Sequence, residues 1–158
     1  MSLVLSAFGL AVLIYRLGFK SSGHLDVAAN LEMPHVTIVV PARDEEENLT
    51  TLLPSLKALD YANFDVVVVD DGSTDKTMDV ASTFGVTVIE AGPKPTGWVG
   101  KNWACARGAE IAKGDFILFT DADTRHRKDS LTKVVAFARS RHAGLVTAPP
   151  FHLAPTWW

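Results

Sequence analysis

The sequence predicts an α/β fold in which helices cover both faces of a parallel sheet. Segments with the pattern of a strand alternate with segments of helical pattern five times after Pro34, and this alternation is typical of parallel sheets with helical crossovers. Residues 66–69 are four consecutive valines, a uniformly apolar run that favours a strand buried on both faces. A chain of 158 residues, 47% of them hydrophobic, has enough apolar material for one compact domain.

The first strand and helix are predicted at residues 35–42 and 45–59. The strand is a β-branched run that closes at Pro41. The helix has acidic residues in its first turn, where the helix dipole favours negative charge. Its leucines recur on one face: Leu49, Leu52, Leu53, Leu56 and Leu59. Pro54 lies inside this pattern, so we expect a kink or a break there, because proline removes a backbone hydrogen bond.

The second and third strands are predicted at residues 64–73 and 86–91. The second strand ends in an acidic turn, and the third is a short apolar run. Between them, residues 74–85 have the pattern of a helix that ends at a glycine. Ser73 or Thr74 is the expected cap of this helix, since hydroxyl side chains satisfy the free N–H groups of a first turn.

Two further helices and two further strands complete the predicted domain. A third helix is expected at residues 100–114 and a fourth strand at residues 115–123. A fourth helix at residues 129–142 and a fifth strand at residues 144–151 follow. The domain is therefore predicted to extend over residues 35–158.

The N-terminal segment has a different character. Residues 3–15 carry no charge, and Arg16 and Lys20 follow them. We expect residues 1–20 to be a membrane-anchor helix and residues 21–34 to be a linker. Positive charge after the apolar run indicates that the globular domain faces the cytoplasm. Because the run is shorter than a full bilayer span, a buried helix of a soluble domain is the alternative.

Composition argues against several classes of function. A net charge of −3 gives no basic face of the kind that nucleic-acid binding requires. The single Cys105 excludes an intrachain disulfide framework and a cysteine-rich zinc site. The histidines have no metal-ligand spacing and are expected to be surface or structural residues: His24, His35, His126, His142 and His152.

Ligands bind at the carboxyl ends of the strands in such sheets, where Asp70 and Asp71 follow the second strand. Adjacent acids repel each other, so capping alone does not explain the pair. We expect Asp71 to accept a hydrogen bond from a nucleobase or a ribose hydroxyl, with a capped loop as the alternative. Asp70 is expected to face the other way and bind backbone.

Asp121 and Asp123 follow the fourth strand. In extended backbone, residues two apart point to the same side, so the two carboxylates are expected to converge. Such a pair suits Mg²⁺ or Mn²⁺, which use few protein ligands when phosphate oxygens and water complete the shell. The alternatives are a hydrated strand end and a salt-bridge cluster with the nearby Arg125 and Arg127.

Lys101 follows Gly100 at the start of the third helix. Free N–H groups at a helix N-terminus together with a lysine favour an anion, although a solvated lysine is the plainer interpretation. The segment is no P-loop, because Trp98 follows Gly97 where that motif has lysine, and the sequence has no Gly-x-Gly-x-x-Gly.

Four segments together resemble the family 2 glycosyltransferases of the GT-A fold. They are VVPARDEEENL, VVVDDGSTDKT, GWVGKNWACARGA and GDFILFTDADT, in that family's order within residues 34–150. The third segment is most similar to members associated with hopanoids and carotenoids. The resemblance implies a GT-A fold, a nucleotide-diphosphate sugar such as a UDP-sugar as donor, and Mn²⁺ or Mg²⁺ as cofactor.

The resemblance also implies a role for individual residues. Asp71 would bind the base, Lys101 would lie near the diphosphate, Asp121 would contact ribose or metal, and Asp123 would hold the metal. The nucleotide pocket would be lined by Pro41, Ala42, Arg43 and Glu45.

The implied reaction is inverting transfer of the sugar to an acceptor hydroxyl, such as that of a lipid. It needs a carboxylate that deprotonates the acceptor, and the family places this acid well downstream of the metal motif. No Asp or Glu follows Asp129 in this chain, so we expect a donor-binding half of a longer enzyme or a truncated product. A non-catalytic nucleotide-sugar-binding subunit is the alternative; a receiver-type signalling domain would have its acidic pair after the first strand.

Overall fold

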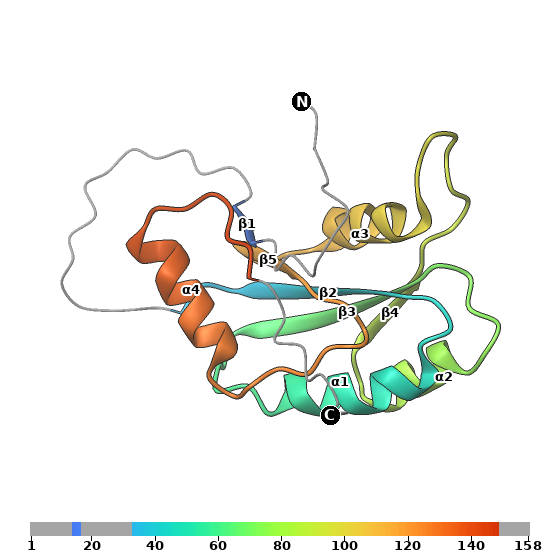
Figure 1. The fold of residues 1–158 in the computed structure, drawn as a ribbon, viewed down its shortest axis with the longest axis horizontal. Coiled ribbons are helices and arrows are strands. Elements are labelled where there is room, and N and C mark those ends of the chain that lie inside the picture. Colours follow the sequence, from blue (N-terminus) through green and yellow to red (C-terminus); the bar gives the residue numbers. More distant parts are fainter. Residues whose placement is uncertain (1–13, 17–32, 149–158) are drawn as a thin grey trace, which may run out of the picture.

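The computed structural model describes residues 14–16 and 33–148, which form a five-stranded sheet with helices on both faces (Figure 1). The strand order is β1-β5-β2-β3-β4. The strands are β1 (Ile14–Arg16), β2 (Val36–Ala42), β3 (Phe64–Asp70), β4 (Thr87–Glu90) and β5 (Phe116–Phe119). Strands β2 to β5 are parallel, and β1 pairs antiparallel with β5. The predicted parallel sheet is thereby confirmed.

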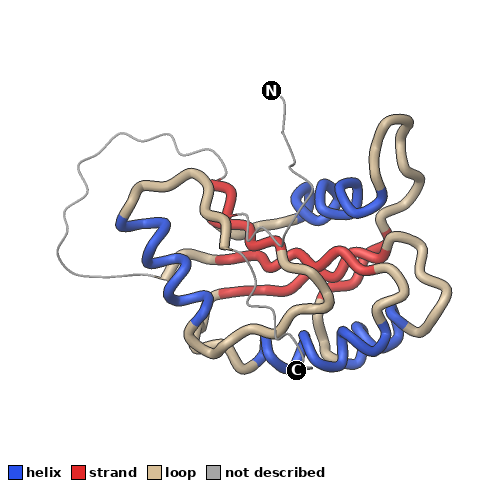
Figure 2. The backbone as a smooth tube through the Cα atoms, in the orientation of Figure 1, coloured by secondary structure: helices blue, strands red, loops and turns tan. Residues whose placement is uncertain are grey.

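Helix α3 covers one face of the sheet, and α1 and α2 lie on the opposite face (Figures 1 and 2). The helices are α1 (Glu46–Lys57), α2 (Thr77–Thr83), α3 (Gly100–Ile111) and α4 (Ser130–Ser140). Leu131 and Val135 of α4 join the core beneath the face that α1 covers. These positions confirm the predicted α/β arrangement with helices on both faces of the sheet.

Each central strand contributes side chains to two cores. In β3, Val66 and Val68 pack toward α1 and α2, whereas Val67 and Val69 pack toward α3. Because successive side chains of a strand point to opposite faces, a sheet that is covered on both sides needs apolar residues at every position. This is why the four valines are consecutive.

Helix α3 lies very close to the sheet. A Cβ at Gly108 would collide with Val39 of β2, so only glycine allows the helix backbone to approach the strand this far. The side of the sheet that carries α3 therefore has a tightly seated helix whose first turn is held near the carboxyl ends of the strands.

At two places the helices differ from expectation: the break, one of the two alternatives at Pro54, is absent, and the expected cap of α2 is wrong. Helix α1 continues through Pro54 to Lys57 without a break; the carbonyl that proline leaves without a partner belongs to exposed Thr50, where water can replace the lost donor. Neither Ser73 nor Thr74 caps α2, which begins at Thr77 with no side-chain cap.

At the two ends, only part of the prediction can be compared with the structure. Residues 144–148 of the predicted fifth strand are not in a strand, and residues 149–151 lie outside the described residues. Residues 14–16 of the predicted anchor helix form β1, in register with residues 116–118 of β5. The remainder of the predicted anchor, and the linker up to residue 32, lie outside the described residues. Within the described residues no helix is long and apolar enough to cross a bilayer.

Candidate functional site

The loops that follow β2 and β3 meet at the carboxyl edge of the sheet. Ala42 pairs with Asp70 in the parallel register, and the backbone N–H of Asp71 donates to the Ala42 carbonyl at 2.9 Å. The predicted pocket residue Ala42 and the predicted base-binding residue Asp71 are thus direct neighbours. Ala42 itself is buried, so it offers its backbone to this edge.

The two acids after β3 have different surroundings. Asp70 is 4% exposed, and its Oδ2 accepts hydrogen bonds from the N–H groups of Gly72 and Ser73, each at 3.1 Å. Gly72 has φ +79°, a left-handed conformation that glycine adopts without strain. Asp71 is only partly buried. The prediction that Asp70 binds backbone agrees with this geometry.

The carboxylate of Asp71 lies against the first turn of α3. A Cβ at Gly100 would collide with Asp71 Oδ2, so the absence of a side chain at Gly100 makes room for this carboxylate. The N-cap residue Val99 makes no side-chain cap. The positive end of the α3 dipole therefore faces the same space as Asp71.

The next residue of α3 connects this space to the strand β5. Lys101 Nζ forms an ion pair with Asp121 Oδ1. The lysine side chain is 58% exposed and that of Asp121 is 26% exposed, so both groups remain accessible to a ligand. A chain of contacts from Ala42 through Asp71, Gly100 and Lys101 to Asp121 thus crosses the carboxyl edge of the sheet.

Residues 121–123, here called the acidic turn, do not have the predicted backbone. Strand β5 ends at Phe119, and Thr124 donates to the Asp121 carbonyl from its N–H at 3.4 Å and from its hydroxyl at 2.7 Å. The chain turns between the two acids, so the extended backbone predicted for Asp121 and Asp123 is wrong. Asp123 is exposed, and among the described residues its carboxylate has no hydrogen bond or ion pair.

The donor set of the acidic turn fits a hard divalent cation. Asp121 and Asp123 supply carboxylate oxygens, and Mg²⁺ and Mn²⁺ are commonly held by one or two carboxylates with substrate phosphates completing the shell. Within residues 33–148 no group of three or more His, Cys, Asp or Glu side chains could enclose an ion. Phosphate oxygens and water would have to supply the other ligands.

Sequence reasoning missed a polar network behind the acidic turn. Nε2 of His126 lies 2.9 Å from Thr120 Oγ1, which also lies 2.9 Å from Thr124 Oγ1. Burial lowers the pKa of His126. The interpretation of His126 as a structural residue agrees with this position. The Thr-x3-Thr-x-His spacing around the acids is the only sequence signal that could have singled the network out.

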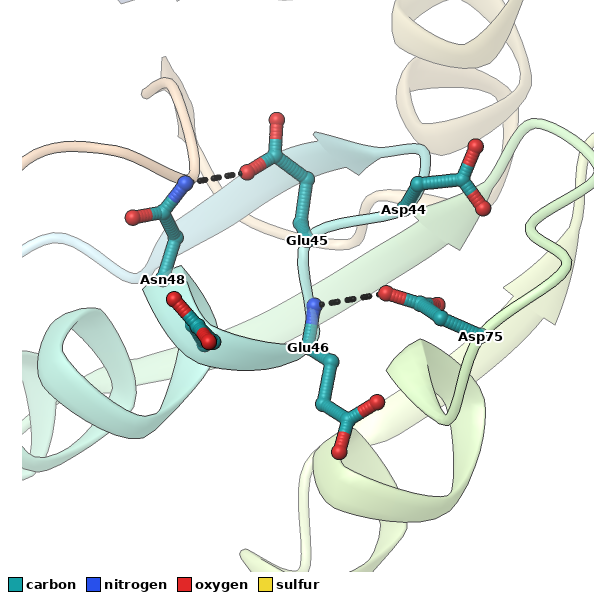
Figure 3. Close-up of a pocket in the computed structure, with 6 residues that line it drawn as sticks. Asp44, Glu45, Glu46, Asn48 and Asp75 are labelled. Atoms are coloured by element: carbon teal, nitrogen blue, oxygen red, sulfur yellow. Dashed lines mark hydrogen bonds between the residues drawn. The ribbon is translucent and has the colours of Figure 1, made fainter.

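The loop after β2 lines an open acidic cavity of about 370 Å³, shown in Figure 3. Its lining residues are Asp44, Glu45, Glu46, Glu47, Asn48 and Asp75. Asp44 has φ +55°, and its Oδ1 accepts from the N–H of Thr74 at 2.7 Å, a bond that lowers the pKa of Asp44. The N–H of Glu46 donates to Asp75 Oδ2 at 3.1 Å. These bonds join the loop after β2 to the loop after β3.

The structure does not bring all predicted pocket residues into one cluster. Glu45 belongs to the acidic cavity, where its Oε2 accepts from Asn48 Nδ2 at 2.6 Å (Figure 3). The Arg43 side chain is 65% exposed, with Nε 4.0 Å from Asp44 Oδ2. Pro41 is half-buried at the end of β2. The contact chain that begins at Ala42 therefore forms the centre of the site.

Comparison with known proteins identifies the family. The family model described as Glycosyl transferase family 2 matches residues 37–157. The chain belongs to this family. It is 36% identical over 132 residues to the 4,4'-diaponeurosporenoate glycosyltransferase of Staphylococcus aureus (strain bovine RF122 / ET3-1). The matched segment covers 82% of this chain and 35% of that relative. The expected similarity to carotenoid-associated members is confirmed, and the chain spans about a third of the length of these relatives.

Solved glycosyltransferase structures share the fold. S. aureus TarS 1-349 in complex with UDP has a TM-score of 0.55 and 30% identity, covering 68% of this chain and 33% of that one. The mannosyltransferase PcManGT from Pyrobaculum calidifontis, in complex with GDP-Man and Mn²⁺, has a TM-score of 0.59 and 28% identity, covering 72% and 35%. These neighbours are GT-A enzymes, so the predicted fold is confirmed.

Proposed function

We propose that this chain forms the donor-binding part of a glycosyltransferase that uses a nucleotide-diphosphate sugar, with a UDP-sugar as the expected donor. The observation that carries the proposal is the contact chain at the carboxyl edge of the sheet. It places Asp71 against Gly100, and Lys101 against Asp121. One surface then offers a hydrogen-bond acceptor, a helix N-terminus, a cation and carboxylates, which together match a base or ribose, a diphosphate and a metal ion.

Asp71 is proposed to bind the nucleoside. Its carboxylate only accepts hydrogen bonds, which suits a base N–H or a ribose hydroxyl. The half-buried Pro41 and buried Ala42 supply the adjacent wall, and Arg43 and Glu45 extend it on the exposed side. The UDP complex of TarS, whose fold matches this chain, supports a uridine nucleotide.

The diphosphate and its metal ion are proposed to be bound by Lys101, Asp121 and Asp123. Lys101 stands at the N-terminus of α3, where free N–H groups favour anions. Asp123 and Asp121 would hold Mn²⁺ or Mg²⁺, which when bound would neutralise negative charge on the leaving diphosphate. Because Lys101 is paired with Asp121, Asp123 is the carboxylate that is free to ligate first. The Mn²⁺ bound to PcManGT supports this assignment.

The transfer itself is proposed to be an inverting displacement. The acceptor oxygen forms a bond to the anomeric carbon as the bond from that carbon to the diphosphate oxygen breaks, and the nucleoside diphosphate leaves with the electron pair. The proton of the acceptor hydroxyl passes to a base that is not among the site residues described above. The name of the Staphylococcus aureus relative supports a lipid-type acceptor. A membrane-associated enzyme with its domain in the cytoplasm is proposed from the positive charge that follows the N-terminal apolar run.

Calorimetric titration with UDP-glucose, with and without Mn²⁺, tests the proposal. We expect binding that Mn²⁺ strengthens, and weaker binding in Lys101→Met. Lys94→Met is the matched control, because Lys94 is also an exposed lysine, lies in the segment before α3 and has no ion pair among the described residues. Absence of binding to UDP-glucose, UDP and other nucleoside diphosphates in the presence of Mn²⁺ would refute the proposal.

A sugar-transfer assay separates the enzyme from its rival. Binding together with transfer to a lipid acceptor supports a glycosyltransferase. Binding without transfer supports the second candidate, a non-catalytic nucleotide-sugar-binding fragment or subunit.

A further inference from the structure

The acidic turn is connected to helix α4 by a chain of side-chain hydrogen bonds. Thr124 Oγ1 lies 2.7 Å from the Asp121 carbonyl oxygen and 2.9 Å from Thr120 Oγ1. Thr120 Oγ1 lies 2.9 Å from Nε2 of His126, and Nδ1 of the same ring lies 3.4 Å from Ser130 Oγ. The chain therefore ends on the backbone of the first acid of the turn.

The direction of every bond in this chain follows from its last acceptor. A carbonyl can only accept, so the Thr124 hydroxyl donates to Asp121. Its one proton is then used, so the Thr120 hydroxyl must donate to Thr124. The proton of Thr120 is used in turn, so Nε2 of His126 must carry a proton and donate to Thr120. In a neutral ring Nδ1 then accepts from the Ser130 hydroxyl.

The surroundings of the ring favour this single arrangement. Burial lowers the pKa of His126, so the imidazole is neutral near pH 7, with one donor and one acceptor. Thr120 is 1% exposed, which keeps water away from the middle of the chain. The backbone N–H of His126 donates to Ser55 Oγ of α1 at 3.1 Å. Ser130 of α4 thus contacts the ring of His126, while Ser55 of α1 holds its backbone.

We propose that His126 is a positioning residue that, through Thr120 and Thr124, fixes the backbone of the acidic turn and thereby the directions of its two carboxylates. The metal-binding part of this inference rests on the proposed function. The network touches no carboxylate oxygen among the described residues, so its effect on a cation is exerted through the backbone. If His126 only filled space, the position of the acidic turn would not depend on the hydroxyl of Thr124.

Matched substitutions separate hydrogen bonding from packing. Thr124→Val keeps the shape of the side chain and removes the hydroxyl, whereas Thr124→Ser keeps the hydroxyl. His126→Leu removes the donor, whereas His126→Gln keeps an N–H near the position of Nε2. Thr132→Val is the control, because Thr132 also donates its hydroxyl to a carbonyl, that of Asp60 at 2.6 Å, away from the acidic turn.

Amide hydrogen exchange in the ligand-free protein gives the first measurement. We expect residues 120–126 to exchange several-fold faster in Thr124→Val and His126→Leu, and at wild-type rates in Thr124→Ser, His126→Gln and Thr132→Val. Urea unfolding confirms that each variant is folded. Unchanged exchange in both Thr124→Val and His126→Leu overturns the inference, whether or not the protein binds a nucleotide.

Paramagnetic resonance of Mn²⁺ in the presence of UDP gives the second measurement. We expect the Mn²⁺ dissociation constant to rise about three- to tenfold in Thr124→Val and His126→Leu, the usual scale of one lost hydrogen bond, while metal-free UDP binding stays at the wild-type level. An equal loss of Mn²⁺ and metal-free UDP binding indicates general damage and overturns the inference. Failure of the wild-type chain to bind UDP with Mn²⁺ refutes the proposed function instead, and the exchange measurement still decides the positioning role.

Discussion

The turn after β3 and the acidic turn after β5 each carry two carboxylates, and in each the first acid is engaged while the second is more open. Asp70 is held by backbone N–H groups of its own turn. Asp121 is held by Lys101, an exposed side chain from another element. The first arrangement is internal to one loop and buried; the second joins two elements and is partly exposed.

This difference separates a fixed subsite from an adjustable one. Backbone donors cannot leave Asp70 without refolding the loop, so Asp71 beside it keeps one position. An exposed ion pair contributes little and exchanges readily, so Lys101 can leave Asp121 when a diphosphate and a cation arrive. Nucleoside recognition is thus expected to be preorganised, and diphosphate recognition to involve rearrangement of side chains.

The largest expected effect separates the two turns by their dependence on metal. Asp123→Ala should abolish the Mn²⁺-dependent part of UDP binding, because it removes the free carboxylate ligand, and leave metal-free binding unchanged. Asp71→Ala should weaken UDP binding with and without metal. Calorimetric titration of both variants with UDP, in Mn²⁺ and in EDTA, measures this. An Asp123→Ala protein that retained its full Mn²⁺ response would remove the functional contrast between the turns.

The second expected effect is on stability. Asp70→Ala should lower the free energy of unfolding by about 1–3 kcal/mol, since it removes a buried acceptor of two N–H groups. Asp121→Ala, which removes one half of a partly exposed ion pair, should cost less than about 1 kcal/mol. Urea unfolding followed by tryptophan fluorescence compares them. Equal losses in the two variants would mean that Asp121 is as fixed as Asp70.

A smaller effect is expected where α3 meets the turn after β3. Gly100→Ala should weaken metal-free UDP binding about tenfold, which corresponds to about 1.4 kcal/mol, because the new methyl group displaces the Asp71 carboxylate. Gly144→Ala is the control, since a Cβ there meets nothing within 4 Å. Titration with UDP in EDTA measures both, and wild-type affinity in Gly100→Ala would show that the position of Asp71 is not limiting.

The smallest expected effect is a pH dependence of stability that comes from His126. Its pKa is lowered in the folded protein from the ordinary value of 6.5, so the unfolded chain binds more protons once the pH falls below about 6.5, and stability declines there. The carboxyls with lowered pKa, Asp44, Asp75 and Asp129, contribute only below about pH 4.

Urea unfolding between about pH 8 and pH 5 measures this decline. It should be present in the wild-type protein and absent in His126→Gln, whose side chain does not titrate. A decline of the same size in both proteins would mean that groups other than His126 cause the pH dependence of stability.

The fold was predictable because its signals are strong and local. The four consecutive valines and the leucine stripe of α1 follow from burial on two faces of a sheet and on one face of a helix. No break occurs at Pro54, because a helix whose leucines are fully buried gains more from packing than one lost hydrogen bond costs. Residues 144–148 of the predicted fifth strand are not in a strand, which shows that apolar and β-branched residues alone do not make a strand without a neighbour to pair with.

The sequence predicted which edge of the sheet Asp71 and Lys101 occupy, but not the local geometry there, and the roles of these residues stay predictions. The position of Asp71 and Lys101 after strands or at a helix start pointed to one edge, and the two are linked there through Gly100. The extended backbone assumed for Asp121 and Asp123 was wrong, because hydrogen bonds from Thr124 bend the chain. The turn is supported by side-chain contacts with Thr120 and His126, which are close in the sequence, and by a bond from His126 to Ser55 of α1, which is distant.

The seating of α3 on the sheet has a consequence for the proposed donor site. Gly108 lies about 12 Å along the helix from Gly100, yet its lack of a side chain sets how deeply the whole helix rests on β2. A bulkier residue at position 108 would push α3 away from the sheet and move Lys101 away from Asp121. The proposed donor site therefore also depends on an apolar contact between α3 and β2, so we expect substitutions at Gly108 to change donor affinity without altering any polar side chain of the site.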